Sequence, residues 1–182
     1  MKTVQASSKQ RGFTLLETLI AMAILSFGVL SLASFFSQGL RSSNDLQIQL
    51  IANQKAQQAL ETIFTARNTQ LLTFAQIQNV SKGGVFLDGA QPLLAPGPDG
   101  LVGTGDDDTS NPDVVVIGPG ADKILGTADD KVLPLNPWMT RTILIQPVNT
   151  YTDMVLVTVT INYTYQGKAG VVTLSSYVSA FS

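Results

Sequence analysis

Near the N-terminus, residues 13–36 form a nearly unbroken apolar run, and this pattern predicts a helix. No proline occurs before Pro92. Only two glycines interrupt the segment up to about Asn68, each costing about 1 kcal/mol relative to alanine in a helix. We therefore expect one helix from Phe13 to about Asn68, roughly 56 residues and about 84 Å long at ~1.5 Å per residue.

Beyond residue 41 the pattern of the expected helix becomes amphipathic. One stripe of apolar residues at helical spacing consists of Ala52, Ala56, Ala59 and Ile63. Polar residues occupy the opposite face, namely Gln47, Gln54, Lys55, Gln58 and Glu61. A stripe of this kind is typical of core packing, so we expect this half of the helix to lay its apolar face on a sheet.

The C-terminal part of the chain alternates between apolar and polar positions, as expected for strands with one buried face. Residues 142–146 predict a short strand, and residues 155–165 and 172–180 predict a hairpin around a turn at 166–170. Residues 85–87 are a candidate for a further short strand. The patterns together predict an α+β fold: a long N-terminal helix packed on a C-terminal antiparallel sheet, with an Asp/Gly-rich loop region between them.

The composition narrows the chemistry that the chain can carry out. None of the 182 residues is Cys or His, which excludes disulfides, thiolate and imidazole metal ligands and the most common general base. Without Lys2, Lys9 and Arg11, the chain holds 8 basic and 13 acidic side chains, a net charge of −5. We expect no nucleic-acid partner, because the body is acidic and has no basic cluster.

Length and charge suggest that the apolar run crosses a membrane. Its 24 residues up to Phe36 suffice for a hydrocarbon core of ~30 Å, and the basic residues before it predict a cytoplasmic N-terminus. Glu17 is its only charge, and a carboxylate in such a segment costs about 2.5–3.5 kcal/mol on insertion scales. A cleaved signal peptide is an alternative, but its apolar region would be about 7–15 residues. An ordinary anchor is another alternative, and it leaves Glu17 unexplained.

The sequence around the start of the run, Gly12-Phe13-Thr14-Leu15-Leu16-Glu17, resembles the processing site of class III leaders. Type IV pilins and the pseudopilins of type II secretion carry such leaders. The resemblance implies that a prepilin peptidase cuts between Gly12 and Phe13 and N-methylates Phe13. It also implies a pilin fold, and pairing of Glu17 with the N-terminus of a neighbouring subunit. A new ammonium group on Phe13 suits this pairing, since a charge without a partner is very costly in lipid.

The same resemblance implies a structural protein, not an enzyme. We expect a subunit of a type IV pilus-like filament that contacts other pilin subunits through its N-terminal helix. A minor pilin is the first expectation, because residues 27–33 and 50–61 are similar to that branch and the membrane half lacks the proline of many major pilins. A minor pseudopilin of type II secretion is the alternative. An anchored enzyme or binding module, such as a hydrolase using Asp107 and Asp130, is the alternative of another class.

The resemblance also predicts where the protein resides and how the chain is divided. Before assembly it would cross the bacterial inner membrane once and meet the assembly platform, and afterwards it would belong to a periplasm-spanning or extracellular filament. The expected divisions are a leader at 1–12, a transmembrane half-helix at 13–40, an amphipathic half-helix at 41–70 and a globular head at 71–182. Within the head we expect repeat loops at 83–137 and antiparallel strands at 140–182.

The middle of the chain contains an internal repeat. Residues 96–107 and residues 119–130 are identical at seven of twelve positions, at an offset of 23 residues. Nine of the thirteen acidic residues lie between Asp88 and Asp130, with Lys123 as the one basic residue among them. Clustered carboxylates with glycine turns suit Ca²⁺, which takes 6–8 oxygen ligands at about 2.3–2.6 Å.

We therefore predict Ca²⁺ as a candidate cofactor. The first site would use Asp99, Asp106 and Asp107, and the second would use Asp122, Asp129 and Asp130. One alternative is a solvated, turn-rich loop in which aspartates cap turns. Another is a pair of sites that the two copies share.

Overall fold

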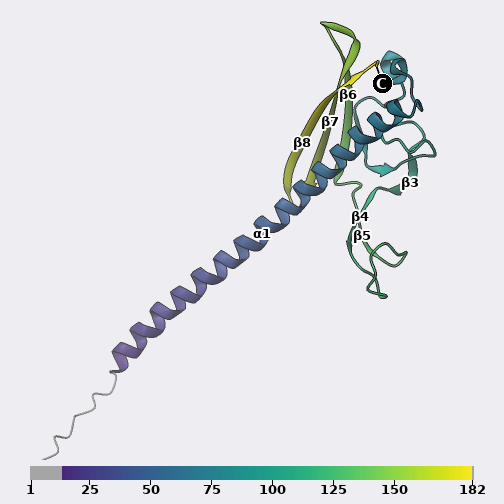
Figure 1. Ribbon diagram of the computed structural model, residues 1–182. Coiled ribbons are helices and arrows are strands. Elements are labelled where there is room, and N and C mark those ends of the chain that lie inside the picture. The colour runs from purple at the N-terminus through teal and green to yellow at the C-terminus, as the bar shows by residue number, and fades with distance from the viewer. Residues whose placement is uncertain (1–13, 182) are drawn as a thin grey trace, which may run out of the picture. The chain divides into compact units, whose positions relative to one another are not determined.

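The computed structural model describes residues 14–181 and divides the chain into two compact units, with the boundary between Asp45 and Leu46. One helix, α1 (Leu15–Asn68), runs through both units (Figure 1). Its last residue agrees with the end expected from the sequence. Thr14 begins the helix as a cap, because its side-chain oxygen accepts a hydrogen bond of 3.3 Å from the backbone N–H of Glu17.

In the first unit, α1 is long and apolar enough to cross a membrane. The large apolar side chains of this part, from Leu15 to Leu40, are exposed. Two of its serine hydroxyls are satisfied inside the helix: Ser26 and Ser31 each donate to the carbonyl four residues earlier, at 2.8 Å. Internal satisfaction of polar groups is what a hydrocarbon environment requires.

The second unit is built on a four-stranded antiparallel sheet (Figure 1). Its strands, in spatial order, are β1 (Ala90–Pro92), β6 (Met139–Val148), β7 (Tyr151–Tyr165) and β8 (Lys168–Ser179). Gln166 and Gly167 form the two-residue loop between β7 and β8, and both have positive φ, 49° and 80°. Such loops match the twist of the flanking strands and thereby set the register of the hairpin.

The core of this unit lies between α1 and the sheet. Small residues of the expected helical stripe, Ala52, Ala56 and Ala59, are completely buried and let the helix approach the strands. The sheet contributes the odd positions of β7, from Val155 to Ile161, and the even positions Val172 and Val178 of β8. The buried positions are therefore those of the more apolar face of the alternating pattern.

The Asp/Gly-rich region contains more regular structure than the sequence indicated. Two short helical turns, η1 (Phe74–Gln76) and η2 (Val80–Lys82), come before it. Two small antiparallel pairs lie within it: β2 (Leu94–Ala95) with β3 (Asp108–Pro112), and β4 (Val114–Gly118) with β5 (Lys131–Pro134). The strand suggested at residues 85–87 is absent from the described structure, where Phe86 makes only isolated bridges to Asn79 and Thr104.

The layout confirms the predicted α+β class and is consistent with the pilin fold. The hairpin expected after residue 155 forms, and the strand expected at 142–146 extends in both directions as β6. Extension is explained by pairing, because β7 pairs with β6 along its whole length and β1 pairs with its N-terminal part. The functional division of the chain stays a prediction.

Candidate functional site

The first candidate site is the start of α1. Gly12 and Phe13 lie outside the described residues, so the predicted cleavage site stays a prediction. Glu17 lies in the first turn of α1 and is exposed. It is the only acidic residue of the helix before Asp45, and apart from Thr14 and Thr18 the residues near it in the sequence are apolar. A carboxylate in the first turn also interacts favourably with the positive end of the helix dipole.

The second candidate site is the repeat, whose two copies adopt the same backbone conformation. We call residues 96–107 the first copy and residues 119–130 the second copy. Gly100 and Lys123 occupy the same position of the repeat and both have positive φ, 72° and 61°. Gly103 and Gly126 correspond in the same way, with φ of 81° and 90°. Such values favour glycine, so the two turns share a demanding geometry and not only a composition.

Each copy is held together by the same hydrogen bonds, which its aspartate carboxylates accept. In the first copy, the N–H of Leu101 donates to Asp99 Oδ1 at 2.8 Å and that of Gly103 donates to Asp107 Oδ2 at 2.8 Å. The hydroxyl of Thr104 donates to Asp106 Oδ1 at 2.8 Å. The second copy repeats all three, with Ile124 to Asp122 at 2.8 Å, Gly126 to Asp130 at 2.7 Å and Thr127 to Asp129 at 2.8 Å.

Each copy has a glycine at its second position, because an aspartate later in the copy lies too close to allow a side chain there. A Cβ on Gly97 would overlap the backbone and carboxylate of Asp106, and a Cβ on Gly120 would overlap the same atoms of Asp129. Each copy is therefore a closed turn in which the second aspartate folds back over the glycine.

The surroundings of the two copies differ. Leu101 and Val102 of the first copy are buried in the core, with exposed fractions of 2% and 1%. The corresponding Ile124 and Leu125 of the second copy are 60% and 64% exposed. The second copy connects β4 to β5, which form a two-stranded sheet of their own in the second unit (Figure 1).

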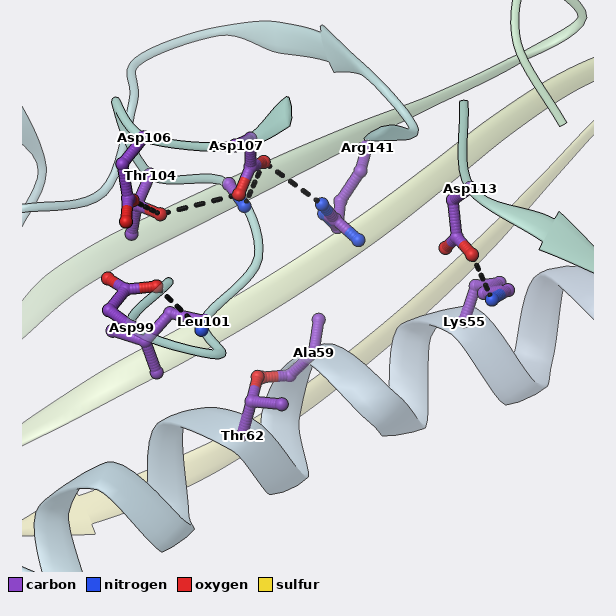
Figure 2. A network of polar contacts seen from close by, with 11 residues as sticks. Lys55, Ala59, Thr62, Asp99, Leu101, Thr104, Asp106, Asp107, Asp113 and Arg141 are labelled. Carbon is purple, nitrogen blue, oxygen red and sulfur yellow. Dashed lines mark hydrogen bonds and ion pairs between the residues drawn. The ribbon is translucent and has the colours of Figure 1, made fainter. Parts of the chain in front are cut away.

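A buried charge network joins the first copy to the sheet (Figure 2). Arg141 on β6 is 2% exposed, and its Nη2 lies 3.8 Å from Asp107 Oδ2. Its Nε and Nη2 have no hydrogen-bond partner in the part of the chain that the structure describes. Nearby, Lys55 of α1 forms an ion pair of 2.7 Å with Asp113, just before β4. Two cations and two carboxylates are thus brought together beside the core.

Burial sets the ionisation of this network. Desolvation raises the pKa of the Asp107 carboxyl above its ordinary value, and hydrogen bonds from Gly103 together with the charge of Arg141 counteract part of that rise. Desolvation also lowers the pKa of the Arg141 guanidinium, against the attraction of Asp107 and Asp113. In the second copy, the hydrogen bond from the Thr127 hydroxyl is the main cause of a lowered pKa for Asp129.

The structure places the six predicted calcium ligands in two separate turns, three in each. Among the described residues, no three acidic side chains converge closely enough to form a ready metal site. Asp107 and Asp130, the pair considered for a hydrolase, belong to different copies, and each accepts a backbone hydrogen bond within its own turn. The calcium prediction is not tested by these observations.

Sequence reasoning missed Arg141, Asp113 and Lys55. The signal for Arg141 was present, since it occupies the buried phase of an alternating strand between Met139 and Ile143. A basic residue there requires a carboxylate nearby. Nothing in the sequence indicated which of the nearby aspartates would supply it.

Comparison with known proteins adds one finding. Residues 7–33 match the family model described as the prokaryotic N-terminal methylation motif, which is the class III leader typical of type IV pilins and pseudopilins. Neither curated proteins nor solved structures gave a match. The N-terminal segment is therefore similar to that of type IV pilins and pseudopilins, and a leader of this class implies processing by prepilin peptidase and assembly with pilin subunits. The leader and α1 together indicate anchoring in the inner membrane before assembly.

Proposed function

We propose that the protein is a structural subunit of a type IV pilus-like filament, in the role of a minor pilin. One observation carries this proposal: the methylation motif leads directly into a long helix whose first part exposes apolar side chains and a single carboxylate. In a membrane those side chains contact lipid, and in a filament they contact the helices of neighbouring subunits. The role is structural, and no residue is assigned to catalysis.

Glu17 gives this assembly its register. Cleavage after Gly12 frees an ammonium group on Phe13, four residues before Glu17 in the chain. A carboxylate alone in hydrocarbon is costly, but a carboxylate beside the ammonium of an adjoining subunit is compensated. The incoming subunit is therefore favoured at the position where the two charges meet.

Mass spectrometry of the mature protein from its native membrane tests the proposal. We expect the polypeptide to begin at Phe13 and to carry one added methyl group. In Gly12→Val, the branched side chain should block cleavage, so the full precursor should accumulate in the membrane. A parent protein that retains its first twelve residues, or that is cut behind the apolar run, would contradict the proposal.

We also propose that the repeats bind Ca²⁺ and that the second copy is the better site. In the first copy, the Arg141 guanidinium lies 3.8 Å from Asp107 and would repel a second cation. In the second copy, Asp130 Oδ1 is buried and has no hydrogen-bond partner within the described residues, so a hard cation would satisfy an oxygen that the turn leaves unpaired. Asp122 and Asp129 would add further carboxylate ligands after a small rearrangement of the turn.

Calorimetric titration of the detergent-solubilised protein with Ca²⁺ tests this second proposal. We expect heat of binding and a higher melting temperature for the parent. Asp129→Asn/Asp130→Asn should abolish both, whereas Asp106→Asn/Asp107→Asn should retain the binding heat. The absence of heat and of a melting shift at millimolar Ca²⁺ would remove the proposal.

A further inference from the structure

The second copy and its flanking strands expose several large apolar side chains within an acidic segment. Ile124 and Leu125 at the tip are 60% and 64% exposed. The strands beside them add four exposed apolar residues, namely Val114, Val116, Ile117 and Val132. Exposed apolar surface of this kind, rimmed by polar residues, marks a protein contact.

The first copy shows what covers this motif when it is docked. Leu101 and Val102 occupy the positions of Ile124 and Leu125, and both are buried in the core. Gly103 N–H donates to Asp107, and a Cβ on Gly103 would meet Ile143, so the turn lies directly against β6. Arg141 of the same strand faces the last carboxylate of the turn. The docked turn thus contacts an apolar surface that also presents one cation.

We propose that the second copy docks in the same way on another protein subunit of the filament, one whose surface combines apolar side chains with an arginine or lysine. Ile124 and Leu125 would be covered as Leu101 and Val102 are covered. Asp130, whose Oδ1 is buried in the turn without a hydrogen-bond partner in the described residues, would turn its carboxylate toward the basic side chain and meet it as Asp107 meets Arg141. The choice of a filament subunit as partner rests on the proposed function.

The partner is a different protein and not another molecule of this protein. The surface that receives the motif in this chain is already occupied by its own Leu101 and Val102. The chain after residue 12 also has a net charge of −5. Another molecule of this protein would therefore carry the same sign of charge as the acidic second copy of the repeat, and the two would repel each other. A basic patch on another subunit has the complementary charge.

Substitution of the apolar pair tests the proposal in cells that express the full chain. Ile124→Asp/Leu125→Asp should lower the incorporated fraction about tenfold or more, because central apolar contacts dominate most interfaces. Val171→Asp is the matched control, since Val171 is 61% exposed but lies on β8, and it should assemble like the parent. Both variants should be processed and should melt like the parent, since neither position is buried. Normal incorporation of the double variant would overturn the proposal.

Crosslinking identifies the partner. The chain has no cysteine, so Ile124→Cys introduces a unique thiol for a photoactivatable reagent. With a calcium chelator present, so that Ca²⁺ cannot compensate Asp130, we expect an adduct with a different subunit beside a lysine or arginine. Asp130→Lys in the same background should reduce the adduct about tenfold. An adduct with another molecule of this protein or with lipid alone would overturn the proposal. So would an adduct whose yield is unchanged by Asp130→Lys. Failure of the proposed function would instead appear as an unprocessed parent protein.

Discussion

Asp107 and Arg141 lie where the first copy of the repeat meets the sheet, and each is nearly inaccessible to solvent. Their separation of 3.8 Å is longer than a good hydrogen bond, so the attraction between them compensates burial only in part. This explains why the pKa of Asp107 is raised although a cation lies beside it.

The raised pKa of Asp107 predicts a specific pH dependence of stability. The folded protein holds this proton more tightly than the unfolded chain does, so the contribution of Asp107 to stability falls as pH rises from its ordinary value of 3.8 through the folded value. Relative to Asp107→Asn, the parent should therefore lose stability across that window and then stay level. The loss is about 1.4 kcal/mol for each tenfold difference between the acid dissociation constants of the folded and unfolded states. Unfolding in urea, followed through the single tryptophan, Trp138, measures this at a series of pH values.

Asp129→Asn provides a comparison in the other copy, at the residue that corresponds to Asp106. The pKa of Asp129 is lowered by its hydrogen bonds, first that from Thr127, so its contribution is present above 3.8 and is lost as pH falls below that value. The two differences from the parent should thus have opposite signs of slope. Parallel pH profiles for the parent and Asp107→Asn would contradict the assignment.

At the scale of the element, α1 combines two surfaces of different chemistry. The alanine stripe of its later part is completely buried, whereas its earlier part exposes leucine, isoleucine and phenylalanine. Alanine at the contact lets the helix backbone approach the sheet closely, and large residues in the membrane half supply surface for lipid or neighbouring helices. The same helix is therefore packed at one end and available for assembly at the other.

The close approach of α1 to the sheet predicts the effect of enlarging one alanine. Ala56 has no exposed surface, so Ala56→Leu must displace its neighbours and should destabilise the protein by about 1–3 kcal/mol. Gln57→Leu is the matched control, because Gln57 is exposed on the same turn and its change should stay within about 0.5 kcal/mol. Urea unfolding of the two variants measures the difference. Equal stability of Ala56→Leu and Gln57→Leu would show that the interface between the helix and the sheet has space for a larger side chain, contrary to the structure.

Periodicity predicted the long elements and failed on the short ones. The alternation over β7 and β8 extends far enough to identify both strands and their buried faces. Strands β2 to β5 have five residues or fewer, and Gly, Pro and Asp around them favour turns, so local pattern carries little signal there. They form because each copy of the repeat is a closed turn that brings the strands on its two sides together. The alternation of apolar and polar residues does not reveal such a turn.

At the scale of the whole molecule, the sequence predicted the N-terminal candidate site but not the difference between the two copies of the repeat. The leader and Glu17 are local features, which a short motif can express completely. The contrast between the two copies of the repeat is not local, since near-identical turns are buried in one place and exposed in the other. That contrast depends on Arg141 and Ile143 of a distant strand, so only the folded chain reveals it.

Glu17 links the membrane state of the molecule to its filament state, and its removal should separate processing from assembly. Glu17→Ala should be cleaved and methylated like the parent but enter filaments about tenfold less, because the ammonium of Phe13 then has no compensating carboxylate in a neighbour. Thr18→Ala is the matched control, since Thr18 is the next exposed residue and its hydroxyl only bonds Leu15 within the helix. The mass-spectrometric ratio of variant to parent in sheared filaments and in membranes, after co-expression, measures incorporation directly. If Glu17→Ala competes with the parent as well as Thr18→Ala does, the charge pair does not guide assembly, and apolar helix contacts alone must account for it.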